Sequence, residues 1–494
     1  MTEVTNFSFN ELDLDAIALA EGRVAFIVAP DGKLSRAARR INKLTKGAVQ
    51  RIVESDKFEK AKEADVLTVS WPNGMAAEAV DLVKLDKRPS VEKARKAGAA
   101  LAKLGGGTSS ELLLILAGMN KHAEDVIMGT ALRGYSFGEH KTLQPKTDPK
   151  TVTVMTSDFE ALAAAAKAPL AIADGVFMTR DLVNEPANVL TTVEFATRIE
   201  GLRDLGVEVE ILDEDQLAEL GMGALLAVGI GSSSPSKVAI MQWNGGEDGD
   251  APLALVGKGV VFDTGGISIK PSGGMEDMTM DMGGAGVVTG VMKALALRNA
   301  QANVVGLVGL VENMPSGDAY RPGDVVTSMK GDTIEVITTD AEGRLVLCDV
   351  MWYAQNRFKP VGMIDLATLT GAIIIGLGHD NAGVFSNNDE LCNCFLKAAR
   401  AEGEGAWRMP LGSGYADAMK SKVADWKNAG GRAAGASTAA EFLHQFVQED
   451  MPWIHLDIAG VADQKTPTML SPAGATGWGV MALDRMIRDM FEGE

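Results

Sequence analysis

Hydrophobic and polar positions along this chain follow two periods. Short apolar runs rich in valine, isoleucine and leucine alternate with longer stretches in which apolar residues recur at helical spacing. The first pattern is typical of buried strands, and the second of helices with one covered face. Strands that are apolar throughout indicate a sheet covered by helices on both faces. We therefore expect an α/β fold with a central mixed sheet.

Two domains are expected, because 494 residues are too many for one ordinary core. Residues 158–183 contain a run of alanines, which favour helix strongly, and they predict a linking helix. Pro186 ends this helix, since proline disfavours a helical conformation at the residue before it. The expected domains are a smaller N-terminal α/β domain, residues 1–160, and a larger C-terminal α/β domain, residues 161–494.

Individual elements are predicted in both domains. In the first domain, strands are expected at residues 24–28, 66–69, 112–116 and 152–155, and helices at 36–54 and 91–103. In the second domain, strands are expected at residues 207–211, 238–242, 253–256, 304–310, 333–337, 361–367, 383–386 and 453–458. Residues 283–297 predict a helix of small residues. Its glycines cost helix propensity, so they indicate that close packing is required there.

Composition and charge narrow the functional classes. Apolar residues make up 46% of the chain and charged residues 23%, as in an ordinary globular protein. The net charge is −19, yet residues 1–150 hold 23 Lys and Arg against 20 Asp and Glu. The acidic remainder repels nucleic acid. The basic helix at residues 36–46 leaves open a DNA-binding accessory protein, although a solvated helix face is the simpler interpretation.

The expected location is the cytoplasm. No apolar segment is expected to cross a bilayer, and the acidic start of the chain lacks the pattern of a signal peptide. The three cysteines are too few for a disulfide framework, and none of the five histidines stands in an HExxH pattern. Metal chemistry in this chain must therefore rely on carboxylates.

One candidate site lies in residues 336–345, with the sequence VITTDAEGRL. An apolar strand is expected before it and a helix from Arg344 onward, so Asp340 and Glu342 lie where open α/β sheets place their ligands. A structural interpretation is also open. Asp340 could cap the helix, Glu342 could favour its dipole, and Arg344 could be a surface charge.

A second stretch, residues 253–284, favours the functional interpretation. Lys258 lies between two glycines after an apolar run, and burial lowers the pKa of a lysine toward the neutral amine, which can bind a metal. Asp263 and Asp281 add oxygen ligands to those of Asp340 and Glu342. Four acids and an amine are too many for one catalytic ion, so two divalent ions that share bridging carboxylates are expected.

Other chemistries find less support. The chain has no GxxxxGK[ST] phosphate loop, and residues 376–378 lack the third glycine of a dinucleotide fingerprint. Residues 412–414 and 231–233 lack the spacing of a nucleophile elbow. A two-metal phosphoesterase stays open as an alternative, since carboxylate clusters of this kind also hydrolyse phosphoesters.

These motifs resemble the leucine aminopeptidases, two-metal exopeptidases whose signature is NTDAEGRL. The resemblance covers the C-terminal two thirds of the chain, including the Asn-x-Pro-x-Asn stretch at residues 184–188. It implies that the larger domain is catalytic and holds two divalent ions per subunit, Mn²⁺ or Zn²⁺. The implied metal ligands are Lys258, Asp263, Asp281, Asp340 and Glu342, and the implied catalytic residues are Lys270 and Arg344. The chain departs from the family pattern at Thr338, Thr264 and Gly283, of which Thr338 replaces the first Asn of the signature.

The resemblance also implies a mechanism. Two ions would activate a water that attacks the peptide carbonyl, and Lys270 would stabilise the resulting gem-diolate. A guanidinium does not give up its proton in proteins, so Arg344 would hold an anion such as bicarbonate, or else would only orient Glu342. Peptides with a free N-terminus are the expected substrates, and a homohexamer is the expected assembly.

Side-chain preference is harder to predict. Met278 lies three residues before Asp281 and could line an apolar pocket together with Leu369 and Gly371, which would favour leucine or methionine. Met278 as an ordinary core residue is an equal alternative.

Overall fold

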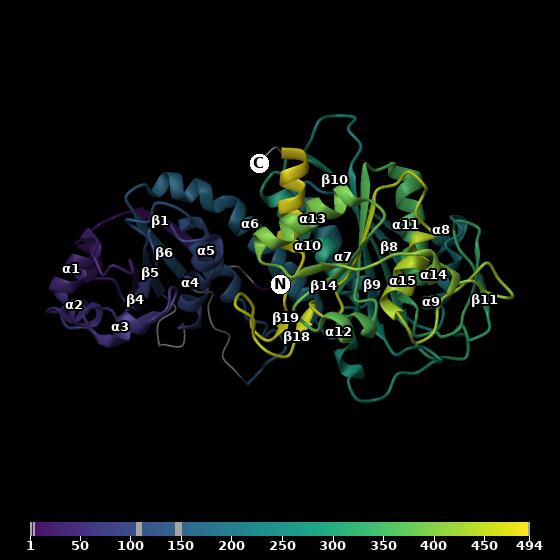
Figure 1. The fold of residues 1–494 in the computed structure, drawn as a ribbon, viewed down its shortest axis with the longest axis horizontal. Coiled ribbons are helices and arrows are strands. Elements are labelled where there is room, and N and C mark those ends of the chain that lie inside the picture. The colour runs from purple at the N-terminus through teal and green to yellow at the C-terminus, as the bar shows by residue number, and fades with distance from the viewer. Residues whose placement is uncertain (1, 3–4, 105–110, 144–150, 493–494) are drawn as a thin grey trace. The chain divides into compact units, whose positions relative to one another are not determined.

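The computed structural model describes residues 2, 5–104, 111–143 and 151–492, and its chain forms two compact units (Figure 1). Unit 1 comprises Met1–Phe177 with Pro467–Pro472, and unit 2 comprises Met178–Thr466 with Ala473–Glu494. Both units are α/β, as the hydrophobic pattern predicts. The domain limits expected at residue 160 stay a prediction.

Unit 1 is built on a six-stranded sheet with the order β1-β6-β5-β2-β4-β3, in which only the β3–β4 pair is antiparallel. Its strands are β1 (Asn6–Glu11), β2 (Arg23–Val28), β3 (Val66–Ser70), β4 (Ala79–Lys84), β5 (Glu111–Ile115) and β6 (Thr151–Thr156). Alternate residues of β2 enter separate core clusters, with Val24 and Phe26 in one and Ala25 in the other. Successive side chains of a strand point to opposite faces, so this sheet is covered on both.

The helices of unit 1 are α1 (Arg36–Leu44), α2 (Ala48–Val53), α3 (Asp56–Lys60), α4 (Val91–Lys103) and α5 (Ala123–Arg133). The single helix expected at residues 36–54 is therefore wrong. Lys46 and Gly47 both have positive φ, 52° and 85°, and this left-handed turn separates α1 from α2. Strands β1 and β4 were not expected from the sequence, and β4 is fully buried although it contains Asp81 and Lys84.

Helix α6 (Phe159–Asn184) is the linking helix expected from the alanine run, and it ends two residues before Pro186. Within the described residues, α6 and the stretch Met275–Leu297 are long and apolar enough to cross a membrane by length and composition. This finding corrects the expectation that no segment reaches that length. In the most apolar window of Met275–Leu297, 83% of the residues are buried inside the protein, as in the core helices of soluble proteins.

Unit 2 is built on a mixed eight-stranded sheet with the order β15-β14-β17-β13-β9-β10-β8-β7. Its strands are β7 (Glu208–Leu212), β8 (Lys237–Asn244), β9 (Leu253–Asp263), β10 (Asn303–Asn313), β13 (Gly362–Ala367), β14 (Ala382–Ser386), β15 (Ala406–Arg408) and β17 (Trp453–Asp457). The four central strands β17, β13, β9 and β10 run parallel, so their carboxyl ends meet at one edge.

Helices cover both faces of this sheet. The helices of unit 2 that follow α6 are α7 (Thr192–Glu200), α8 (Glu214–Glu219), α9 (Gly223–Gly229), α10 (Gly283–Leu297), α11 (Gly343–Phe358), α12 (Gly371–Leu377), α13 (Asp389–Glu402), α14 (Ser413–Asp417), α15 (Gly435–His444) and α16 (Val480–Ile487). On β10, Gly306 faces Val288 of α10, whereas Gly309 faces Val346 of α11. Helices α10 and α11 therefore pack on opposite faces.

The strand expected at residues 333–337 is shorter than predicted and is not part of the central sheet. It spans Thr333–Glu335 (β12) and belongs to a small sheet with β11 (Val325–Thr327) and β16 (Trp426–Lys427), outside the central one. The Asn428 side chain accepts hydrogen bonds from the backbone N–H groups of Ile337 and Thr338, which take the place of a strand ladder. Ile334 and Val336 are buried but Ile337 is 43% exposed, so the run is buried only in part.

Candidate metal centre

Lys258 lies in the middle of β9 and is 2% exposed. It is in register with Gly309 of β10, so its side chain points to the face covered by α11. A Cβ added at Gly343, the first residue of α11, would lie 2.5 Å from Lys258 Cε. On the other face, a Cβ at Gly284 of α10 would lie 2.0 Å from the carbonyl oxygen of Leu366. The missing side chains therefore let α11 approach Lys258 on one face and α10 approach β13, the neighbour of the lysine's strand, on the other.

The Lys258 ammonium joins two segments that are distant in the sequence. Its Nζ lies 2.7 Å from Asp281 Oδ1 and 2.8 Å from Glu342 Oε1, and it donates to the carbonyl oxygen of Thr368 at 3.4 Å. Burial alone would lower the pKa of Lys258, but Asp281, Glu342 and Asp263 outweigh it and raise the pKa. Among the protein's own groups, Lys258 is thus a cation, and the expected neutral amine requires other positive charge nearby.

Lys270 makes the corresponding contacts on the other side of the cluster. It lies in the loop after β9, and its Nζ is 2.7 Å from Asp263 Oδ2 and 2.5 Å from Asp340 Oδ1. Its side chain is 21% exposed and that of Asp340 is 39% exposed. Lys258 is therefore the enclosed lysine of the cluster, and Lys270 lies at its solvent-accessible side.

The four carboxylates exceed the two lysines in charge. Oxygen atoms of Asp263, Asp340 and Glu342 lie within 4.8 Å of one another, which is a spacing that can hold a metal ion. Asp281 Oδ2 and Glu342 Oε2 are buried and have no hydrogen-bond partner among the described residues. Buried polar atoms are normally satisfied, so these two oxygens fit cation ligands. The residues present therefore match divalent ions with oxygen and amine ligands.

The pKa values of the carboxylates reflect this crowding. Burial, and then the charge of Glu342, raise the pKa of Asp263 to about 6. Burial also raises the pKa of Asp281 and of Asp340. Burial would raise the pKa of Glu342 as well, but Lys258 and Lys270 hold it at about 2. The two lysines thus lower the pKa of one acid while burial raises the pKa of the other three, a divergence that is expected where like charges share a site.

Arg344 lies in the first turn of α11 and is 8% exposed. Burial lowers the pKa of its guanidinium to about 10, against the opposite effect of Glu342 and Asp457. Its Nε is buried and has no hydrogen-bond partner in the described part of the chain. The group therefore remains a cation at neutral pH and has a donor available for an anion.

Comparisons with known proteins identify the family. Residues 177–483 match the catalytic domain of the cytosol aminopeptidase family, and residues 25–144 match the N-terminal domain of the same family. The chain belongs to this family. It is 63% identical to a probable cytosol aminopeptidase of Dinoroseobacter shibae over the full length of both chains, and 59% identical to one of Cereibacter sphaeroides, with the same full coverage.

The resemblance to aminopeptidases is therefore confirmed, and the protein is a hydrolase, a metal-dependent aminopeptidase. A solved structure with a similar fold is the bottromycin maturation enzyme BotP in complex with Mn. It is 32% identical, with a TM-score of 0.82, and the match covers 95% of this chain and 99% of that one. The expected two-domain α/β architecture is confirmed by these matches.

Two residues of this aminopeptidase contact the acids but were missed from the sequence. Asn313 ends β10 beside Asp263, and its Nδ2 donates to Asp263 Oδ1 at 2.7 Å. Thr368 follows β13, and its hydroxyl donates to Asp281 Oδ1 at 2.8 Å. Asn313 is the last residue of its parallel strand, and Thr368 is the first residue after its own. A polar residue at the carboxyl end of a parallel strand is the sequence signal by which both could have been predicted.

The unusual Thr338 of the aminopeptidase signature has a local role. Its hydroxyl accepts a hydrogen bond from the N–H of Asp340 at 3.3 Å, and its carbonyl oxygen accepts one from Asn428 Nδ2 at 2.7 Å. The turn that presents Asp340 is thus fixed from two sides.

The structure shows where the three residues of the predicted substrate pocket lie and how far each is buried. Met278 is half-buried in the 3-10 helix Met275–Met282 that also carries Asp281. Leu369 is half-buried, and Gly371 is exposed at the start of α12. Their role toward substrate stays a prediction.

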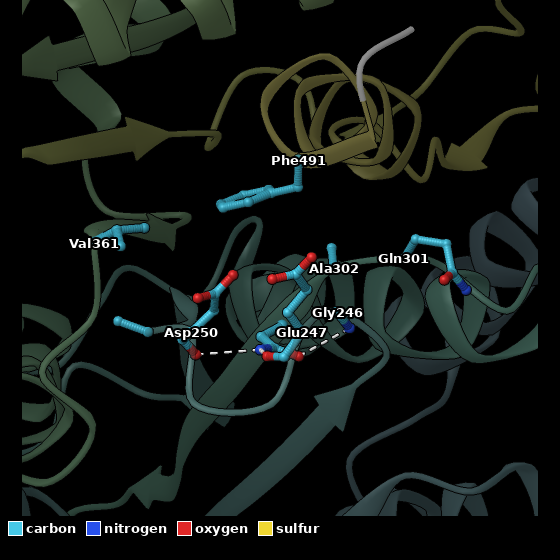
Figure 2. Close-up of a pocket in the computed structure, with 9 residues that line it drawn as sticks. Gly246, Glu247, Asp250, Gln301, Ala302, Val361 and Phe491 are labelled. Carbon is cyan, nitrogen blue, oxygen red and sulfur yellow. Dashed lines mark hydrogen bonds between the residues drawn. The ribbon is translucent and has the colours of Figure 1, made fainter.

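Two other features of the protein lie outside this centre. A cavity of about 460 Å³ in unit 2 is lined by Glu247, Asp250 and Phe491 among others, and Figure 2 shows the Phe491 ring above the two carboxylates. None of the predicted site residues lines it. In unit 1, His122 contacts Asp125, whose carboxylate is already paired with Arg95.

Proposed function

We propose that this aminopeptidase releases N-terminal residues from peptides, with a preference for leucine or similar apolar residues, and that it uses two divalent ions, Mn²⁺ or Zn²⁺. The observation that supports two ions is the excess of carboxylates over ammonium groups, together with the two buried oxygens that lack a partner among the described residues. The similar BotP enzyme was solved in complex with Mn, which fits the same choice of metal.

The ions would be held by the four acids and the enclosed lysine, namely Lys258, Asp263, Asp281, Asp340 and Glu342. When bound, such ions polarise a carbonyl oxygen and lower the pKa of water so that it can attack near neutral pH. With the ions bound, Lys258 would no longer be needed as the counter-charge for the carboxylates, and its amine could be neutral.

Lys270 and Arg344 have separate roles in this proposal. Lys270 lies at the solvent-accessible side of the cluster, where its ammonium stabilises the negative charge that develops on the substrate carbonyl oxygen. Arg344 would hold an anion such as bicarbonate through its Nε, which has no partner among the described residues, and such an anion would supply a group that can take a proton from water and return it to the leaving amine. A bound anion that can accept a proton is needed because the guanidinium itself cannot.

The substrate needs a free N-terminus. A neutral α-amine would complete the coordination of one ion through its lone pair, with Asp281 nearby as a hydrogen-bond acceptor. The amide nitrogen of an acetylated N-terminus has no such lone pair to offer. Met278, Leu369 and Gly371 would line the pocket for the first side chain, and Gly371 has open space around its Cα.

The relatives are named cytosol aminopeptidases, and we infer the cytoplasm as the location and a homohexamer as the assembly by family resemblance. Sedimentation of the purified protein tests the hexamer.

One experiment separates this function from the alternatives. With added Mn²⁺, we expect release of p-nitroaniline from leucine p-nitroanilide and none from N-acetyl-leucine p-nitroanilide. Hydrolysis of p-nitrophenyl phosphate at a comparable rate would instead favour a phosphoesterase. Metal analysis of protein purified without chelator should give two ions per subunit, and tight DNA binding at physiological salt would support the DNA-binding alternative.

A further inference from the structure

The loop of residues 368–371 connects β13 to α12 and contacts the metal centre at its first residue. The Thr368 carbonyl oxygen accepts from Lys258 Nζ, and the Thr368 hydroxyl donates to Asp281 Oδ1. Its next residues include Leu369 and Gly371 of the proposed substrate pocket. A displacement of this loop would therefore affect two candidate metal ligands and the pocket together.

A second buried carboxylate, that of Asp457, holds the next two residues of this loop. Asp457, the last residue of β17, is 0% exposed. Its Oδ1 accepts from the N–H groups of Leu369 at 3.1 Å and Thr370 at 3.4 Å, and its Oδ2 accepts from the Thr370 hydroxyl at 2.6 Å. The same hydroxyl accepts from the N–H of Ile373 at 3.1 Å and so caps α12.

Contacts between β17 and β13 fix the position of the Asp457 carboxylate. Asp457 is in register with Ala367, the last residue of β13. Two residues earlier on the same face, His455 Nδ1 lies 2.6 Å from Asp365 Oδ1, while Trp453 Nε1 donates to Asp365 Oδ2 at 2.7 Å. These contacts tie β17 to β13 below the point where Asp457 meets the loop.

We propose that Asp457 is a positioning residue for the reaction, which sets the loop of residues 368–371 against the metal centre and so tunes the substrate pocket. This inference rests on the proposed function for its kinetic part. Its structural part, that the carboxylate and not general packing orders the loop, stands by itself.

Four variants test the proposal. Asp457→Asn keeps the volume and one acceptor oxygen but replaces the acceptor of the Thr370 hydroxyl by an NH₂ donor. Thr370→Val removes the hydroxyl at equal volume, and Thr370→Ser keeps it. Glu404→Gln is the matched control, because Glu404 is also a buried carboxylate that accepts from two backbone N–H groups, those of Gly479 and Ala482 at the start of α16.

The first measurement is hydrogen exchange, followed by mass spectrometry, on the metal-free full-length protein. We expect faster exchange in residues 368–371 for Asp457→Asn and Thr370→Val, and wild-type exchange there for Thr370→Ser and Glu404→Gln. Unchanged exchange in Asp457→Asn, or an equal increase in Glu404→Gln, overturns the proposal. If Asp457→Asn fails to fold, the comparison of Thr370→Val with Thr370→Ser decides.

The second measurement is kcat/KM with Mn²⁺ for leucine and alanine p-nitroanilides. A misplacement of about 1 Å can cost about 10²-fold in rate, so we expect a loss of that order in Asp457→Asn. The leucine-to-alanine ratio should also change, whereas Glu404→Gln keeps the wild-type ratio even if its thermal midpoint falls. An unchanged ratio together with wild-type exchange refutes the inference. A wild type that is inactive on both substrates contradicts the proposed function, and exchange then decides the structural part.

Discussion

Unit 2 contains two clusters of buried charge that differ in how their charges are matched. Around Arg298, at the end of α10, the guanidinium Nε donates to Asp484 at 2.6 Å and its two terminal nitrogens to Glu492. The other oxygen of Asp484 accepts from Arg488 at 3.0 Å. Each carboxylate oxygen of this cluster has a cationic donor, as a structural ion-pair network requires.

At the candidate metal centre, negatively charged groups outnumber positively charged ones. Four acids face two lysines, and Asp281 and Glu342 each retain a buried oxygen without a partner within the described residues. The difference indicates that buried charge by itself does not reveal a functional site. An excess of one sign, with ligand atoms unsatisfied, is the informative feature.

The largest expected effect comes from removing a candidate ligand. Glu342→Gln should lower kcat/KM for leucine p-nitroanilide by roughly 10⁴-fold, as for an essential member of a catalytic group, and should lower the Mn²⁺ content. The metal-free variant should be less stable than the metal-free wild type at neutral pH, because the lysines that lower the pKa of Glu342 attract its ionised form and Gln carries no charge. Glu492→Gln is the control and should leave kcat/KM unchanged. Normal turnover in Glu342→Gln would contradict the proposed centre.

A substitution in the arginine cluster should lower stability and leave turnover unchanged. Arg298→Met leaves Asp484 buried without one of its two cations, so the free energy of unfolding should fall by about 3–5 kcal/mol. The value of kcat for the folded protein should be unchanged. Urea unfolding and kcat measured on the same preparations test this, and a stable but inactive variant would show that the two clusters are coupled.

Lys270→Ala should lower kcat by about 10²–10³-fold, as for loss of one group that stabilises the developing oxyanion. Mn²⁺ content should stay near two ions per subunit. Lys465→Ala, a change at an exposed lysine, is the control. If activity and metal content fell together, Lys270 would be a ligand or a scaffold residue and its proposed role would be wrong.

The smallest effect is a pH dependence of the metal-free protein. The pKa of Asp263 in the folded protein, about 6, lies above its usual value of 3.8, so the folded state binds this proton more tightly than the unfolded state. Its contribution to stability is present below pH 4 and is lost as the pH rises through 6. In chelator, Asp263→Asn should therefore gain stability relative to wild type over this range. Parallel unfolding curves against pH would contradict it.

The sequence predicted the elements whose pattern is local. Helix α10 spans the expected residues 283–297, and the glycine content that indicated close packing corresponds to the tight approach of Gly284 to Leu366. The strand before Asp340 was misplaced, because an apolar run does not specify which sheet it joins. Asn428, which is distant in the sequence, decides that point by binding residues 337 and 338.

The candidate site was predicted residue by residue through its motif, and the structure brings the four acids and the two lysines together. The direction in which the pKa of Lys258 changes could not be predicted, because it depends on carboxylates that are brought together only in the folded protein. Asn313 and Thr368 were missed for the same reason. A lone amide or hydroxyl at a strand end becomes informative only when the neighbouring strand is known.

The absence of a side chain at Gly343 has a consequence for protein engineering. One added methyl group at this position would collide with the stem of Lys258, so the spacing between helix and strand cannot be widened by a conservative exchange. Redesign of the candidate centre for an ion of another size would have to change the candidate ligands, because the contact between Gly343 and Lys258 leaves no room to move the lysine side chain.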